Sequence, residues 1–122
     1  MKQNRVSGKR VLVVEDNPSA RQSIKLLLNI DRHIVTEAEN GQAALDRVAE
    51  QPFDLVVLDY FMPGMQGGEV AMLIKCMAPC LPILMVSAYL EKLHDVDKPV
   101  DAVLGKPFAV DDLRREVAKL LC

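Results

Sequence analysis

The sequence predicts an α/β protein in which a five-stranded parallel sheet carries helices on both faces. Two observations lead to this fold class: short, dense apolar runs recur along the chain, and segments with a helical apolar period separate them. Short runs that do not alternate between apolar and polar residues are typical of parallel strands buried on both faces. Strands that alternate with helices are joined by right-handed crossovers, which gives a three-layer α/β/α arrangement.

Five segments are expected to be strands. Four are apolar runs of valine, leucine, isoleucine and similar residues, and the fifth is a shorter β-branched segment that predicts a strand less strongly. The apolar runs are too short for helices. They are residues 11–14, 55–58, 83–86 and the weaker run 102–104, and the shorter segment is residues 34–36.

Four further segments carry apolar residues at helical spacing. The first follows Asn17-Pro18, a capping residue and a proline suited to the first turn, and the second follows Asn40-Gly41. The third starts at Gly68, and the last lies at the C-terminus. Their apolar stripes are Ala20, Ile24, Leu27 and Leu28; Ala44, Leu45, Val48 and Ala49; Val70, Leu73, Ile74 and Met77; and Leu113, Val117, Leu120 and Leu121.

Length and composition limit the class of protein. The chain has 122 residues, with 15 Lys+Arg and 17 Asp+Glu for a formal net charge of −2. No apolar run approaches the roughly 20 residues of a membrane span, the N-terminus lacks a signal-peptide pattern, and no basic stripe suggests nucleic-acid binding. We expect a cytoplasmic protein that binds neither membrane nor nucleic acid. Residues 1–8 are expected to form a tail, and residues 9–122 are expected to form one domain. Cys76 and Cys80 are expected to be free thiols that are buried or half-buried.

Five polar side chains stand at the ends of the expected strands. Glu15 and Asp16 follow the first strand, Asp59 the third, Ser87 the fourth and Lys106 the last. The carboxyl ends of parallel strands share one edge of the sheet, where ligands bind in such folds. Three carboxylates that lie close together repel one another and need a cation, and hard oxygen ligands favour Mg²⁺ over zinc or copper.

This set of side chains favours phosphoryl transfer onto a carboxylate. A metal and a cationic side chain stabilise the charge of such a transition state, and a carboxylate at a strand end can be the nucleophile. Asp59 is the best candidate because it stands alone at its strand end, whereas Glu15 and Asp16 are adjacent and better placed to hold the metal. Lys106 and the Ser87 hydroxyl suit the incoming anion.

Four motifs in this order resemble the receiver domain of two-component response regulators. They are VVEDN at residues 13–17, LDYFMPGMQG at 58–67, VSA at 86–88 and KPF at 106–108. The likeness runs from about residue 9 to the C-terminus. The resemblance implies a flavodoxin-like, doubly wound sheet with the strand order 2-1-3-4-5.

The resemblance also implies a role for each matching residue. Asp59 would accept a phosphoryl group from a sensor histidine kinase or a histidine phosphotransfer protein and so control an output partner that the sequence does not identify. Asp16 would bind Mg²⁺ directly and Glu15 through water, with Asp59 and the backbone carbonyl of Phe61 completing the set.

On the other side of the implied site, Ser87 and Lys106 match the residues that contact the phosphoryl group. Ala88, like Phe61, matches a position that lines the cofactor site. Members of the family usually hold the peptide bond before the proline of the last motif in the cis form, so we expect a cis Lys106-Pro107 bond.

Two departures from the family pattern concern the output. Val103 stands where an aromatic residue is common, and a valine cannot swing a ring between buried and exposed positions. The segment between Ser87 and Lys106 is about three residues short and contains Pro99, so a fourth helix is expected to be short or irregular. Both changes favour an altered output partner.

Two alternatives remain beside the phosphoacceptor switch. The first is a degenerate receiver that acts as a protein-interaction module without phosphorylation, and Val103 and the short segment favour it. The second is a metal-dependent phosphohydrolase with an aspartyl-phosphate intermediate. Enzymes resembling haloacid dehalogenases need an aspartate two residues after the nucleophile, and Phe61 occupies that position.

Overall fold

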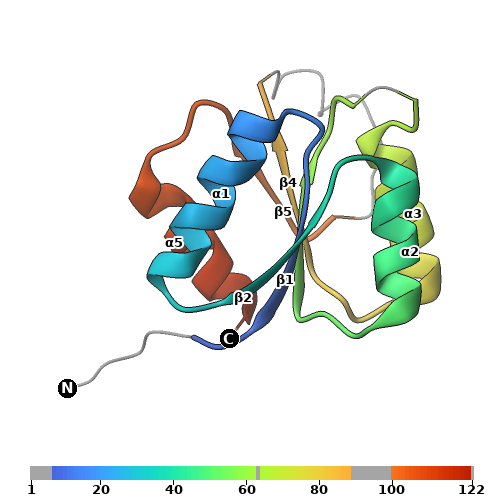
Figure 1. Ribbon diagram of the computed structural model, residues 1–122, viewed down its shortest axis with the longest axis horizontal. Helices are drawn as coiled ribbons and strands as arrows, with labels where there is room; N and C mark the ends of the chain where they lie inside the picture. The colour runs from blue at the N-terminus through green and yellow to red at the C-terminus, as the bar shows by residue number, and fades with distance from the viewer. Residues whose placement is uncertain (1–6, 63, 89–99, 122) are drawn as a thin grey trace.

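The computed structural model describes residues 7–62, 64–88 and 100–121, and it contains one parallel sheet (Figure 1). Its strands are β1 (Arg10–Val14), β2 (Ile34–Ala38), β3 (Leu55–Asp59), β4 (Ile83–Ser87) and β5 (Ala102–Gly105), in the spatial order β2-β1-β3-β4-β5. All four neighbouring pairs are parallel. The predicted fold class and strand order are confirmed.

In the described residues, four helices cover the two faces of the sheet. They are α1 (Pro18–Ile30), α2 (Gly41–Glu50), α3 (Gly67–Met77) and α5 (Val110–Leu121). Figure 1 shows α1 and α5 together on one face and α2 and α3 on the other, which confirms the three layers. The expected fourth helix falls on residues 89–99, outside the described residues, so that prediction stays open. The division into a tail of residues 1–8 and one domain also stays a prediction.

The apolar strands supply two cores, one on each face. In β1, Leu12 and Val14 face the α2–α3 layer, whereas Val11 and Val13 face the α1–α5 layer. Successive side chains of a strand point to opposite faces, so a strand covered on both sides must be apolar at every position. This explains why β1, β3 and β4 appear in the sequence as unbroken apolar runs. At the edge of the sheet, β5 is less buried, and the Val103 side chain is 40% exposed.

The second strand is longer than the sequence suggested. It continues to Ala38 because Glu37, which interrupts the apolar pattern, forms ion pairs with Arg21 and Lys25 of α1 at 3.1 and 3.2 Å. A polar residue on an edge strand can be satisfied by the helix that packs beside it. Polarity alone therefore gave the wrong end for β2.

The helices begin near the predicted residues, and two of them have side-chain caps. The side chains of Asn17 and Asn40 accept hydrogen bonds from backbone N–H groups in the first turns of α1 and α2. The third helix begins at Gly67, one residue earlier than expected. None of the helices in the described ranges is long and apolar enough to cross a membrane.

Some burial predictions were wrong. Ala49, near the end of α2, is exposed. Met77 is 46% exposed, because the small residue Ala71 completes the buried face of α3 in its place. Cys76 and Cys80 are free thiols, as expected, but both are exposed rather than buried or half-buried. The first lies off the buried face of α3, and the second lies in the loop beyond it.

Candidate functional site

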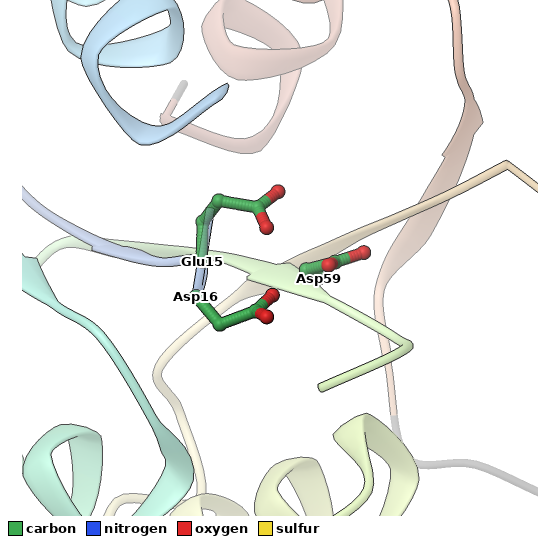
Figure 2. A group of neighbouring side chains, drawn as sticks. All are labelled: Glu15, Asp16 and Asp59. Atoms are coloured by element: carbon green, nitrogen blue, oxygen red, sulfur yellow. The ribbon is translucent and has the colours of Figure 1, made fainter. Parts of the chain in front are cut away.

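Three carboxylates meet at the carboxyl edge of the sheet. Glu15 and Asp16 directly follow β1, and Asp59 is the last residue of β3, the strand that pairs with β1. One oxygen atom from each carboxylate lies within 4.8 Å of the others. Figure 2 shows the three side chains extending in the same direction from the strand ends. Hard oxygen donors at these separations fit a divalent cation such as Mg²⁺, whose charge would offset their mutual repulsion.

Lys106 reaches this cluster from the end of β5, an edge strand of the sheet. It follows β5, and its Nζ lies 2.6 Å from Oε1 of Glu15 and 3.5 Å from Oδ1 of Asp59. The Lys106 backbone N–H donates to the carbonyl oxygen of Ser87 at 2.7 Å. The Lys106-Pro107 bond is cis, which confirms the expectation from the motif. The lysine is therefore the resident cation among the buried carboxylates.

The two buried carboxylates respond differently to this environment. Burial raises the pKa of Asp59 to about 6, an effect that Lys106 opposes and the nearby Glu15 carboxylate reinforces. Burial also acts to raise the pKa of Glu15, but the hydrogen bond and charge of Lys106, with the backbone N–H of Asn17, hold that pKa below its ordinary value. Lys106 therefore stabilises Glu15 as an anion, while Asp59 gains a proton more readily than an exposed aspartate.

The pKa of Asp59 predicts how stability changes with pH. A carboxyl group whose pKa is higher in the folded protein than in the unfolded chain favours folding at low pH, and that stability is lost as the pH rises through about 6. Asp59→Asn cannot ionise. We expect this variant to exceed the wild type in free energy of unfolding by about 1–3 kcal/mol at pH 7.5, with the difference vanishing below about pH 4. Urea unfolding followed by circular dichroism, without divalent metal, measures it.

The control for this comparison is Asp46→Asn, which changes an exposed aspartate on α2. It should show no comparable gain in stability at pH 7.5. An Asp59→Asn protein that is less stable than the wild type at pH 7.5 would contradict the view that the Asp59 carboxylate is strained by its burial.

The remaining predicted residues lie around the carboxylates. Ser87 is fully buried at the end of β4, the strand between β3 and β5, and pairs in register with Gly105. Ala88, the next residue, is exposed. Phe61 follows β3 by two residues, is 36% exposed, and packs edge-on against the Tyr60 ring with 4.7 Å between ring centroids. The strand ends thus bring the predicted residues to one edge, although their roles stay predictions.

A groove that no sequence pattern predicted opens beside Lys106. The groove has a volume of about 430 Å³ and lies between α1 and the segment before α5. It arises from packing between segments more than 60 residues apart, so no local pattern announces it. Its walls are mostly apolar and are formed by Ala20, Ser23, Ile24, Leu27, Ala88, Lys106, Pro107 and Phe108.

Arg21 also supports the site, and the sequence analysis did not predict this role. Its guanidinium group donates to the backbone carbonyl oxygen of Glu15 at 2.8 Å and to the side chain of Glu37 at 3.1 Å. Arg21 therefore ties the end of β1 to the edge strand β2. In the sequence it appears only as a charged residue on the polar side of the predicted first helix.

Comparisons with known proteins agree with this arrangement. Residues 11–118 match the response regulator receiver domain family. The response regulator MprA of Mycolicibacterium vanbaalenii is 36% identical over 115 residues, which are 92% of this chain and 50% of that protein, and MprA of Mycobacterium avium is 35% identical over the same length. The chain therefore spans about half the length of these curated relatives.

Solved structures show the same fold. The response regulator TrrA of Thermotoga maritima, in complex with Mg²⁺-BeF, superposes with a TM-score of 0.88 at 37% sequence identity, covering 93% of this chain and 99% of that one. NtrX of Brucella abortus superposes with a TM-score of 0.87 at 25% identity, covering 93% of this chain and 27% of that one.

Proposed function

This chain belongs to the response regulator receiver domain family, and on that premise we propose that it is a phosphoacceptor switch in which Asp59 takes a phosphoryl group with the help of Mg²⁺. One observation carries the proposal: three carboxylates lie within 4.8 Å of one another, and the lysine at the end of β5 reaches two of them. The set provides an acceptor, a place for a metal and a cation for the incoming phosphoryl oxygens.

The carboxylates of Asp16 and Asp59 and the backbone carbonyl of Phe61 would hold the metal, with Glu15 acting through water. When bound, Mg²⁺ would neutralise charge on the phosphoryl oxygens and on the acceptor, which lowers the barrier to their approach. The donor set supports this choice, because its oxygen ligands are hard and Asp16, the least buried of the three acids, leaves the site open to water.

The transfer itself would use groups of this chain on both sides of the phosphorus. An Asp59 carboxylate oxygen forms the new P–O bond, and the P–N bond of a donor phosphohistidine breaks as its electron pair returns to the imidazole. Lys106 would then pair with the phosphoryl oxygens, and the Ser87 hydroxyl and the Ala88 backbone N–H are the neighbouring donors. The only group transferred is the one that Asp59 receives, so no external substrate is turned over.

The phosphoryl donor in this proposal is a sensor histidine kinase or a histidine phosphotransfer protein. Such a partner must bring its histidine to the edge of the sheet where Asp59 lies. The apolar groove between α1 and Phe108 borders Lys106 and Ala88 at this edge, so we assign it to a helix of the donor. The cytoplasm, where ATP-dependent kinases act, stays the proposed location.

A receiver that acts without phosphorylation is the second candidate function. Val103, exposed on the edge strand β5, favours it because no aromatic ring stands there to report the state of Asp59. The retained acid cluster and Lys106 favour the phosphoacceptor. A phosphohydrolase is the weakest candidate, since Phe61 offers no carboxyl group as a general acid. Direct nucleic-acid binding is not proposed for this chain, because its net charge is −2.

Binding of beryllofluoride, which mimics a phosphoryl group, tests the proposal. Amide NMR spectra of the chain should show saturable shifts around Asp59, Ser87 and Lys106 that require both beryllofluoride and Mg²⁺. Spread of the shifts toward Val103 and α5 would locate the output face. A folded protein whose spectrum does not change would contradict the phosphoacceptor and support the phosphorylation-independent module.

A further inference from the structure

A glycine at the start of α3 lies against the backbone that leaves the acceptor strand. A Cβ atom added to Gly67 would be 2.6 Å from the Cα of Tyr60, 2.7 Å from the backbone oxygen of Asp59 and 2.9 Å from that of Tyr60. Carbon atoms make favourable contact at roughly 3.5–4.0 Å, so no side chain fits here without a shift of the backbone. The N–H of Gly67 also donates to the Tyr60 carbonyl at 2.8 Å.

The strand side of this contact is fixed in place. Asp59 pairs in register with Val86 of β4, and the N–H of Tyr60 donates to the Val86 carbonyl at 2.9 Å. All five residues of β3 are buried in the sheet. A methyl group at position 67 therefore displaces the parts of this contact that the sheet does not hold, which are the first turn of α3 and the Phe61 backbone beyond Tyr60.

We infer that Gly67 is a positioning residue for the metal site: its lack of a side chain lets the Tyr60-Phe61 backbone lie close enough to α3 to hold the Phe61 carbonyl beside the Asp59 carboxylate. Gly67 contacts neither metal nor phosphoryl group in this account. The inference rests on the proposed function, because the Phe61 carbonyl matters only if the site binds a cation. Changes to residues that orient a metal ligand typically lower metal affinity by about tenfold to a hundredfold, so the effect of a displaced Phe61 carbonyl should be measurable.

Gly41, the first residue of α2, offers a matched control. A Cβ atom added there would lie 2.7 Å from Cγ2 of Val70 and 3.1 Å from Cβ of Met65. A methyl group is crowded at Gly41 too, but the atoms that it meets belong to side chains between α2 and α3 and not to the backbone next to Asp59. Gly41→Ala should therefore disturb packing without moving the Phe61 carbonyl.

The test compares Mg²⁺ binding with folding stability in the wild type, Gly67→Ala and Gly41→Ala. Isothermal titration calorimetry gives the Mg²⁺ affinity, and urea unfolding gives the stability of each protein. We expect Gly67→Ala to weaken Mg²⁺ binding by about tenfold to a hundredfold. Gly41→Ala should lose stability and keep the wild-type affinity within about twofold, since its overlap spares the site. If Gly67→Ala is partly unfolded, trimethylamine oxide restores folding and the affinities are compared in that solvent.

Each outcome decides a different question. Wild-type Mg²⁺ affinity in folded Gly67→Ala would overturn the inference and leave the proposed function intact. An equal loss of affinity in Gly41→Ala would also overturn it, because general loosening of the α2–α3 layer would then be the cause. Absence of Mg²⁺ binding by the wild type would contradict the proposed function itself.

Discussion

Asp59→Asn should abolish phosphorylation of the chain. Incubation of the wild type with Mg²⁺ and a small phosphoryl donor such as phosphoramidate is expected to add one phosphoryl group, seen as an increase in intact mass. The asparagine amide cannot supply a carboxylate oxygen to the phosphorus, and the neighbouring Glu15 is held by Lys106 at 2.6 Å. The expected loss is at least about a hundredfold in the extent of labelling, since a nucleophile is removed outright.

The stability difference described above makes this variant informative. Asp59→Asn should be more stable than the wild type at neutral pH, so loss of labelling cannot be blamed on unfolding. Asp46→Asn is again the control and should be labelled as the wild type is. Acid-labile label on Asp59→Asn at the wild-type level would show that another residue is the acceptor.

Lys106→Met should separate phosphorylation from its consequences. The methionine keeps an apolar stem of similar length but removes the cation that lies between Glu15 and Asp59. The metal then no longer competes with a resident ammonium group, so Mg²⁺ affinity should rise by about threefold to tenfold. The beryllofluoride adduct loses the cation that follows β5, so the amide shifts of β5 and α5 that we expect for the wild type should be absent.

Lys119→Met, which changes an exposed lysine of α5, controls for the loss of one positive charge. It should leave both the Mg²⁺ affinity and the shifts unchanged. If Lys106→Met transmits the shifts to α5 as the wild type does, Lys106 is not the link between Asp59 and the output face.

The fold could be predicted because burial on both faces forces a simple pattern on β1, β3 and β4. Every residue in such a strand faces a core, so the strand appears as an unbroken apolar run regardless of the partner helices. The pattern weakens at the edge strand β2, which continues through Glu37 because α1 supplies cations. It also weakens in α3, which buries the small residue Ala71 instead of Met77. Small and polar residues carry little periodic signal, which is why these details were missed.

The site could be located for a similar reason. Parallel strands bring their carboxyl ends to one edge, so the residues at the ends of β1 and β3 lie close together regardless of how the loops run. Contacts that depend on how distant segments pack could not be predicted. Among them are the pairing of Lys106 with Glu15, the support of the Glu15 backbone by Arg21 and the close approach of Gly67 to Tyr60.

Mapping the phosphorylated residue shows whether Asp59 is the acceptor. The wild-type chain is treated with phosphoramidate and Mg²⁺ and then reduced with borohydride, which converts a phosphorylated aspartate to homoserine, and peptides are mapped by mass spectrometry. We expect homoserine at position 59 alone, and only when Mg²⁺ is present. Homoserine at another position, or none from a folded sample that binds Mg²⁺, would contradict the assignment of Asp59 as the acceptor.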